Sequence, residues 1–179
     1  MSGGEKFLAL TGGVGGAKLA LGLREMFGPE QLSFLVNTGD DFEHLGLHVS
    51  PDLDTLMYAL AGLSNPETGW GRVDESWQFI ASLRELGGEA WFNLGDRDLA
   101  VHVLRTARLR AGISLSTVTR ELNTALGTRH PIWPMSDDPV PTIVHTPGGP
   151  LAFQHYFVRD RCAPAVTGFE FSQAAAARP

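Results

Sequence analysis

A glycine-rich turn near the start of the chain is the first feature whose residue types and spacing suit chemistry. Its residues are Gly12, Gly13, Val14, Gly15 and Gly16, followed by Ala17 and Lys18. The turn lies between an apolar run and an amphipathic segment, which predicts a strand before it and a helix after it. Free backbone N–H groups at a helix N-terminus bind phosphate, and glycines allow close approach. The pattern predicts a phosphate-binding turn; the alternative is a tight turn without a ligand.

This turn matches neither of two common nucleotide-binding motifs. In a P-loop, the lysine follows a glycine and precedes a serine or threonine, whereas Lys18 lies between Ala17 and Leu19. In the dinucleotide fingerprint, a third glycine stands where this chain has Lys18. The turn therefore indicates a phosphate ligand without identifying the nucleotide.

Four aspartates follow within a short stretch of the chain. Asp40 and Asp41 come after Asn37 at the expected end of a second strand, and Asp52 and Asp54 stand at the expected start of a helix. Ligands of open α/β sheets bind at the carboxyl ends of the strands. Clustered carboxylates there suit Mg²⁺, which binds one or two carboxylates together with phosphate oxygens. For Asp52 alone, stabilisation of the helix N-terminus is the more common role, whereas Asp54 stands later in the turn and is less easily explained that way.

Two further polar segments are candidates for ligand binding. Arg97 stands at the expected start of a helix, where its charge opposes the helix dipole. It is expected to pair with Asp98 or Asp54, or to bind an anionic or planar ligand. Ser136 and Asp137 follow a third expected strand and form either a plain turn or part of a ligand site.

The elements that position these residues follow from the apolar periodicity. Strands are expected at 7–11, 32–36 and 132–135, with a helix over 17–27 connecting the first two as a parallel βαβ unit. His44 and His48 are expected in a loop. Helices are expected over 51–61, 74–86, 97–111 and 114–126, with Asp74 and Asp96 as caps, which makes 51–126 a helical insertion. Segments 142–146 and 151–158 predict a β-hairpin, 169–171 one more strand, and 174–177 the start of a helix.

Composition bounds the class of protein. The 179 residues suffice for one domain, 43% of them are hydrophobic, and the net charge is −6. The acidic balance argues against a nucleic-acid partner, and no apolar run is long enough for a membrane helix. A single cysteine, Cys162, excludes an intramolecular disulfide framework. We therefore expect a cytoplasmic protein and a single α/β nucleotide-binding domain over 1–179.

Several motifs, in order along nearly the whole chain, resemble the 2-phospho-L-lactate transferase (CofD) family. They are LTGGVGGAKLALGL, VNTGDDFEHLGLHVSPDLDTLMYALAGLSNPETGWG, LGDRDLAVHVLRTARLRAGISLSTVTREL, PMSDDPVPTIVHT and FQHYFVRDRCAPAVTGFEF. The SPDLDT, GDRD and MSDDP segments are specific in combination, whereas GGVGG alone is a weak signal. The resemblance implies an α/β fold with a Rossmann-like, mostly parallel sheet, a helical insertion and a β-hairpin.

The resemblance also implies a chemistry. Such enzymes use Mg²⁺ to transfer a phospholactyl or phosphoenolpyruvyl group from a guanosine-diphosphate-activated donor to the deazaflavin precursor Fo of coenzyme F-420, and release GMP. In this resemblance, the glycine-rich turn over 12–16 contacts the diphosphate, Asp40 and Asp54 hold the metal or the acceptor, and Asn93 and Arg97 line the acceptor pocket. Together with the sequence patterns above, we expect the following roles: Asp40, Asp41 and Asp54 catalytic; Asp40 and Asp54 metal-binding; Gly12, Gly13, Gly15, Gly16, Lys18 and Asn37 nucleotide- or phosphate-binding; Asp52, Asp54, Asn93, Arg97, Ser136 and Asp137 acceptor-binding.

Two expectations concern the extent of the chain and its assembly, and two alternative functions stand beside the transferase. Family chains continue beyond the point where this one stops, so it is expected to cover their N-terminal portion, and a homodimer is also expected. One alternative function is a non-catalytic nucleotide-sugar-binding regulator of the same superfamily. The other is a nicotinamide-dependent oxidoreductase, in which Asp40 or Asp41 would bind a ribose; the missing third glycine argues against it.

Overall fold

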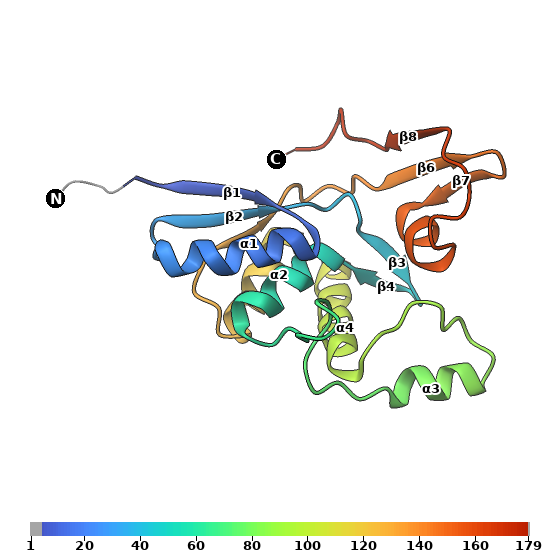
Figure 1. Cartoon of the computed structure of the whole chain (residues 1–179), viewed down its shortest axis with the longest axis horizontal. Coiled ribbons are helices and arrows are strands. Elements are labelled where there is room, and N and C mark those ends of the chain that lie inside the picture. Colours follow the sequence, from blue (N-terminus) through green and yellow to red (C-terminus); the bar gives the residue numbers. More distant parts are fainter. Residues whose placement is uncertain (1–4, 179) are drawn as a thin grey trace.

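A three-stranded parallel sheet organises the chain. The computed structural model describes residues 5–178. Strands β1 (Phe7–Thr11), β2 (Leu32–Val36) and β5 (Ile132–Pro134) lie in the order β1-β2-β5, and both pairs are parallel. Helix α1 (Gly13–Met26) connects the first two strands (Figure 1). The predicted α/β fold with its parallel sheet is therefore confirmed.

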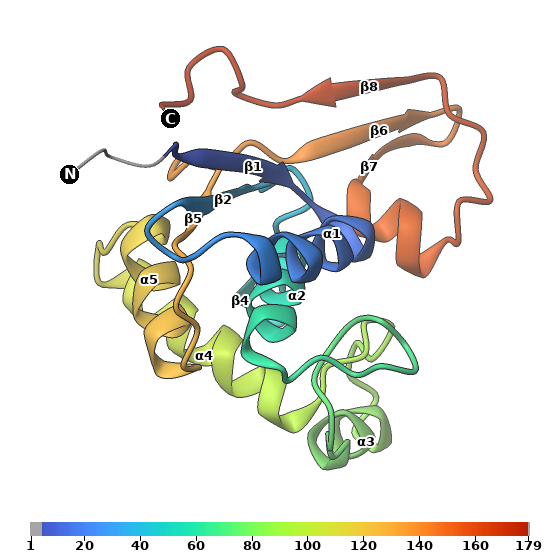
Figure 2. The same ribbon diagram turned by 60° about the vertical axis from the view of Figure 1, so that its left-hand side comes forward.

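The core lies on one face of this sheet. Along β2, Leu32, Phe34 and Val36 alternate with less buried residues and are each 1% exposed or less. They pack against α1, α2 (Pro51–Ala61) and α5 (Leu115–Ala125), which lie on the same side (Figure 2). On the opposite face, Leu10 is 75% exposed. The strand alternation thus gives this sheet one buried and one exposed apolar face.

Helix α1 begins four residues earlier than the sequence indicated. The expected start was Ala17, but the helix includes Gly13, Val14, Gly15 and Gly16. Gly13 has a φ of 62°, a backbone conformation that favours glycine, and it takes the chain from the strand directly into the helix. Most of the glycine-rich segment therefore forms the first helical turn itself.

A small antiparallel hairpin replaces the loop that was expected around the two histidines. Strand β3 (Phe42–His44) pairs with β4 (Leu47–Val49) through a turn in which Leu45 and Gly46 both have positive φ. The prediction that His44 and His48 are loop residues was wrong, because the three-residue strands are too short to show a clear alternation. The hairpin takes the chain from the carboxyl end of β2 to the start of α2.

The N-termini of helices α3 (Gln78–Glu85) and α4 (Asp96–Arg110) are each capped by a carboxylate that lies outside the helix it caps. The Asp96 carboxylate accepts hydrogen bonds from the N–H groups of Gln78 and Phe79, at the start of α3. The Glu75 carboxylate accepts them from the N–H groups of Arg97 and Asp98, at the start of α4. The predictions that Asp74 caps α3 and that Asp96 caps its own helix were therefore wrong. Each helix is capped by a carboxylate from a segment distant in the sequence, and the local sequence around a helix start does not reveal such a partner.

The C-terminal part forms a second sheet beside the first. Strand β6 (Thr142–Thr146) pairs antiparallel with β7 (Gly149–Ala152) on one side and with β8 (Gly168–Phe171) on the other. The hairpin was predicted, but its second strand ends at Ala152, and a π-helix, η1 (His155–Arg159), follows. Residues 174–176 form turns and Ala177 belongs to no regular element, in place of the expected helix. Within residues 5–178, no helix has the length and apolarity needed to cross a membrane.

Because one face of the sheet is buried and the other exposed, truncating a side chain on each face should lower the free energy of unfolding by different amounts. Phe34 is fully buried, so Phe34→Ala should lower the free energy of unfolding by about 3–5 kcal/mol. Leu10→Ala, on the exposed face of the same sheet, should change it by less than about 0.5 kcal/mol. Urea denaturation followed by circular dichroism measures both. Equal losses in the two variants would contradict the assignment of the core to one face.

Candidate active site

Two cavities meet at the carboxyl end of the parallel sheet. The first, of about 580 Å³, is called the aromatic cavity; the second, of about 540 Å³, is called the hairpin cavity. Three residues line both cavities: Asp40, Phe153 and Gln154. The residues that line the aromatic cavity include Gly13, Val14, Asp52, Asp54, Tyr58, Trp70, Trp91, Phe92, Asn93, Asp98, His102 and Phe157. Those of the hairpin cavity include Thr38, Asp41, His48, Ser136, Asp137, Asp138 and Thr142.

The N-terminus of α1 opens into the aromatic cavity. Gly13 and Val14 line it, and the first turn of the helix has neither a capping side chain nor an acidic residue. Its free N–H groups and partial positive charge therefore favour an anion there. At Gly12, a Cβ atom would lie 2.8 Å from the Asp52 Oδ2 atom, so only glycine allows this approach.

The other residues of the glycine-rich segment do not line either cavity. Gly15 and Lys18 are exposed. A Cβ atom on Gly16 would collide with the Thr11 hydroxyl, so Gly16 allows α1 to pack on the end of β1. The phosphate-binding roles predicted for Gly15, Gly16 and Lys18 stay predictions.

Asp40 and Asp52 come together at the cavity wall. The Asn37 Nδ2 atom donates to Asp40 Oδ1 at 3.2 Å and to Asp52 Oδ2 at 3.0 Å. Burial of Asp40, followed by the charge of Asp52, raises the Asp40 pKa to about 6. Asn37 therefore acts at this edge of the sheet by joining two carboxylates that repel each other.

Asp41 points away from this pair, into a hydrogen-bonded cluster beside the hairpin cavity. Its Oδ2 atom accepts a hydrogen bond from Ser50 Oγ at 2.7 Å and lies 3.2 Å from His48 Nε2. Burial raises the pKa of Asp41, although its contacts with His48 and Ser50 oppose that effect. The Asp41 Oδ1 atom is buried without a hydrogen-bond partner among the described residues. Ser50 stands at the N-cap position of α2, but its hydroxyl donates to Asp41 and makes no capping hydrogen bond to the helix.

Asp54 forms a buried ion pair with Arg105 of α4. The two terminal nitrogens of the guanidinium bind the two carboxylate oxygens, and Arg105 itself is fully buried. The charge of Asp54 holds the pKa of Arg105 above its usual value in spite of burial. Asp54 lines the aromatic cavity, but both of its oxygens bind Arg105, so its catalytic, metal-binding and acceptor-binding roles stay predictions.

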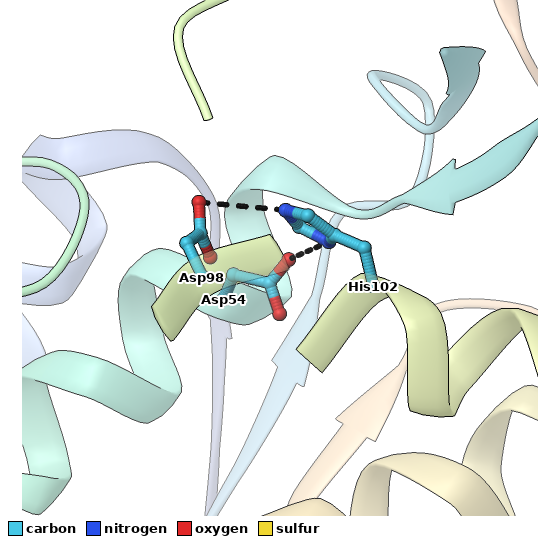
Figure 3. Close-up of side chains that lie close together, drawn as sticks. All are labelled: Asp54, Asp98 and His102. Atoms are coloured by element: carbon cyan, nitrogen blue, oxygen red, sulfur yellow. Dashed lines mark ion pairs between the residues drawn. The ribbon is translucent and has the colours of Figure 1, made fainter. Parts of the chain in front are cut away.

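His102 lies between two carboxylates next to this ion pair (Figure 3). Its Nδ1 atom is 3.6 Å from Asp54 Oδ2, and its Nε2 atom is 3.4 Å from Asp98 Oδ2. Burial disfavours ionisation of Asp98, but its contacts with His102 and Tyr58 outweigh burial and lower the Asp98 pKa. The Tyr58 hydroxyl donates to Asp98 Oδ1 at 2.5 Å.

These three side chains are close enough together to bind a metal ion. However, the Arg105 guanidinium lies 3.2 Å from His102 Nδ1 and is bound to Asp54. Its fixed positive charge opposes a second cation at this point. We therefore interpret Asp54, Asp98 and His102 as an ion-paired network that determines the shape of the cavity wall.

Ser136 and Asp137 line the hairpin cavity and also make structural contacts. The Asp137 carboxylate accepts hydrogen bonds from the backbone N–H and the hydroxyl of Ser116, in the first turn of α5. The Ser136 hydroxyl donates to the Arg178 carbonyl oxygen. The segment therefore has structural contacts of the kind expected for a plain turn, and it also lines a cavity. Its expected role in a ligand site stays a prediction.

Two of the six residues expected to bind the acceptor differ in their relation to the cavities. Asn93 lines the aromatic cavity, whereas Arg97 is exposed and outside both cavities. The prediction that Arg97 pairs with Asp98 or Asp54 was wrong, because within residues 5–178 those carboxylates contact Tyr58, His102 and Arg105. A ligand contact of Arg97 stays a prediction.

Sequence reasoning missed the aromatic wall and the buried network. Trp91 and Phe92 have ring centroids 5.6 Å apart, and Phe153 stacks on Phe157 at 5.6 Å. These rings come from segments far apart in the chain, so no local pattern joins them. The buried network had a signal: Asp98, His102 and Arg105 follow one another at helical i, i+4 and i+7 spacing, on one face of α4.

Both cavities are lined by acidic side chains. None of the lining residues, among those that the structure describes, is a lysine or an arginine. Several carboxylates line the two cavities, and the charge of Asp52 contributes to the raised pKa of Asp40. A hard divalent cation such as Mg²⁺ fits this set of oxygen donors. A phosphate ligand here would depend on such a cation, on backbone N–H groups and on neutral side chains.

Comparison with known proteins assigns the chain to a protein family. The family model described as 2-phospho-L-lactate transferase CofD matches residues 7–179. A phosphoenolpyruvate transferase from Kitasatospora aureofaciens is 46% identical over 160 residues, which are 86% of this chain and 50% of that protein. A 2-phospho-L-lactate transferase from Methanospirillum hungatei is 42% identical over 152 residues, 85% of this chain and 51% of that protein. The chain thus spans about half the length of the curated relatives it matches.

A solved structure shares the fold. A member of the UPF0052 family from Bacillus halodurans aligns with a TM-score of 0.57 and 13% sequence identity, over 99% of this chain and 54% of that one. At this identity, the likeness concerns the fold alone.

The raised pKa of Asp40 predicts a pH-dependent effect on stability. Because its pKa is higher in the folded than in the unfolded state, the fold loses stability as the pH rises from about 4 through about 6. Asp40→Asn resembles the neutral form. In buffer with EDTA, its Tm should exceed that of the wild type at pH 8, and the difference should shrink toward pH 5.

The control is Asp138→Asn. Hydrogen bonds from Arg178 lower the pKa of Asp138, so this variant should gain no stability at pH 8. A Tm difference for Asp40→Asn that is the same at pH 5 and pH 8 would contradict the repulsion between Asp40 and Asp52.

Proposed function

Because the chain belongs to the 2-phospho-L-lactate transferase (CofD) family, we propose that it takes part in transfer of a phospholactyl or phosphoenolpyruvyl group. The donor is a guanosine-diphosphate-activated acid, the acceptor is a hydroxyl group of the deazaflavin Fo, and GMP is released. The observation that carries the proposal is the meeting of two cavities at Asp40, beside an uncapped helix N-terminus. A transferase needs two adjacent ligand sites with the reacting atoms between them.

The aromatic cavity suits the deazaflavin. Its wall of Trp70, Trp91, Phe92 and Phe157 offers flat apolar surfaces to a planar ring system. The hairpin cavity then accommodates the rest of the donor, whose diphosphate lies at the boundary, near the start of α1. This arrangement brings the acceptor hydroxyl and the donor phosphorus together near Asp40.

The bonds change as follows. The acceptor oxygen forms a bond to the phosphorus that carries the acid, and the bond from that phosphorus to the bridging oxygen of the diphosphate breaks. The electron pair of the broken bond stays on the leaving GMP, and the hydroxyl proton passes to a carboxylate. The Asp41 Oδ1 atom, which has no partner among the described residues, and Asp52 are the candidates for accepting this proton. Positioning and charge neutralisation account for most of the catalysis in such a displacement.

Mg²⁺ is the proposed cofactor, and Asp40 is its first proposed ligand. For the second ligand we prefer Asp52 to Asp54, because both Asp54 oxygens are bound to Arg105, whereas Asp52 shares only the Asn37 amide with Asp40. When bound, the cation supplies positive charge that offsets the charge of the diphosphate. Asn37 orients both carboxylates toward one point, whether or not the cation is present.

The two alternatives gain no support. The family match covers residues 7–179 and concerns a transferase family, not a nicotinamide-dependent oxidoreductase. The resemblance to the UPF0052 protein concerns the fold alone and therefore does not favour a binding protein without activity.

A transfer assay tests the function. The protein is incubated with Mg²⁺, Fo and either guanosine-diphosphate-activated lactate or its enolpyruvyl counterpart, and the products are measured by mass spectrometry. We expect the phosphodiester of Fo together with an equal amount of GMP. Asp40→Asn should reduce the rate by at least about 100-fold, while Asp160→Asn, whose carboxylate pairs with Arg159 outside both cavities, should leave it unchanged. No product with either donor would refute the proposal for this chain.

Metal binding has its own readout in the absence of substrates. At pH 8, addition of Mg²⁺ should raise the Tm of the wild type, because it relieves the repulsion between Asp40 and Asp52. The increase should be lost in Asp40→Asn and in Asp52→Asn and kept in Asp160→Asn. An undiminished increase in Asp52→Asn would exclude Asp52 as a ligand.

A further inference from the structure

The boundary between the two cavities is formed by very few side chains. Within residues 5–178, Asp40, Phe153 and Gln154 are the residues that line both. We propose that Gln154 is a catalytic residue, whose carboxamide donates a hydrogen bond to the transferring phosphoryl group. This inference rests on the proposed function, since it places the reacting phosphorus where the two cavities meet.

The burial of Gln154 is unusual for its chemistry. The residue is 5% exposed, and within residues 5–178 its side chain is neither in a hydrogen bond nor among the buried polar groups without a partner. The polar atoms of its carboxamide are therefore accessible from the cavities that the residue lines. A ligand at the boundary of the cavities can accept a hydrogen bond from this free amide.

Two regular elements hold the backbone of Gln154. It lies after β7, which pairs with β6, and directly before η1. Phe153, the residue before it, stacks on Phe157 of η1 with ring centroids 5.6 Å apart. A donor whose backbone is already in place needs little reorganisation when charge develops on the phosphoryl oxygens, and this is what makes such donors effective.

The choice among the three boundary residues follows from their chemistry. Asp40 is an acid and accepts hydrogen bonds when ionised, and Phe153 offers no polar atom. Gln154 alone brings two N–H donors without adding negative charge. Because the lining of both cavities, as far as the structure describes it, lacks lysine and arginine, a neutral donor at this point has no cationic side chain to compete with.

Kinetics of the full chain test the catalytic role. Gln154→Met keeps the volume and removes the hydrogen bond, so it should lower kcat by about 100-fold while the KM values for donor and acceptor change little. Gln154→Glu, which adds negative charge, should lower kcat further. The matched control is Gln78→Met, on the exposed start of α3, which should behave as the wild type. An unchanged kcat in Gln154→Met, or a loss that appears only in KM, would overturn the proposal.

Nuclear magnetic resonance tests the contact without turnover. In ¹⁵N-labelled protein, the side-chain NH₂ signals of Gln154 are assigned by their absence in Gln154→Met. Addition of GDP with Mg²⁺, in which the β-phosphate stands in for the transferring group, should shift these signals and leave those of Gln31 and Gln78 in place. Unshifted Gln154 signals at saturating GDP would overturn the contact.

The two failures are distinguishable. If the Gln154 signals shift but neither donor gives product, the contact stands and the proposed transfer fails. If product forms at a rate that Gln154→Met does not reduce, the transfer stands and the role of Gln154 fails.

Discussion

The buried ion pair between Asp54 and Arg105 is the interaction on which the site depends. A fully buried guanidinium is stable only when its charge is matched, and here both oxygens of Asp54 bind it. The pair connects α4 to the first turn of α2, and Arg105 lies 3.5 Å from the His48 carbonyl oxygen of β4 as well. Removal of either partner would leave an isolated buried charge, which is far costlier than the loss of a surface contact.

This pair also separates the roles of two aspartates that look alike in the sequence. Asp52 and Asp54 are two residues apart on a helix and therefore point to different sides of it. Because Asp54 faces α4 and is neutralised there, Asp52 is left to face Asn37 and Asp40. The result is a pair of carboxylates next to the uncapped start of α1, so that negative charge adjoins the positive end of a helix dipole.

The second sheet completes the site from the other side. Strand β7 and η1 bring Phe153 and Gln154 to the boundary of the two cavities, while β6 contributes Thr142 to the hairpin cavity. Without this C-terminal unit, the carboxyl edge of the parallel sheet would be an open surface. The parallel sheet therefore collects the charged groups, and the antiparallel sheet divides the space around them into two compartments.

The sequence by itself determined the βαβ unit, the positions of the three parallel strands, most helix ends and the clustering of acids after β2, because these follow from apolar periodicity and from glycine and proline signals along the chain. It also placed Asp40, Asp41, Asn93 and Ser136 in segments that do line the cavities. Only the tertiary structure decided that Asp54 is paired with Arg105, that Asp96 caps α3 and Glu75 caps α4, and that Gln154 lies between the cavities. The capping contacts and the ion pair join residues 17 or more positions apart, and the place of Gln154 depends on how two sheets pack. Local sequence patterns do not indicate which distant residue a side chain contacts, so only the tertiary structure shows these arrangements.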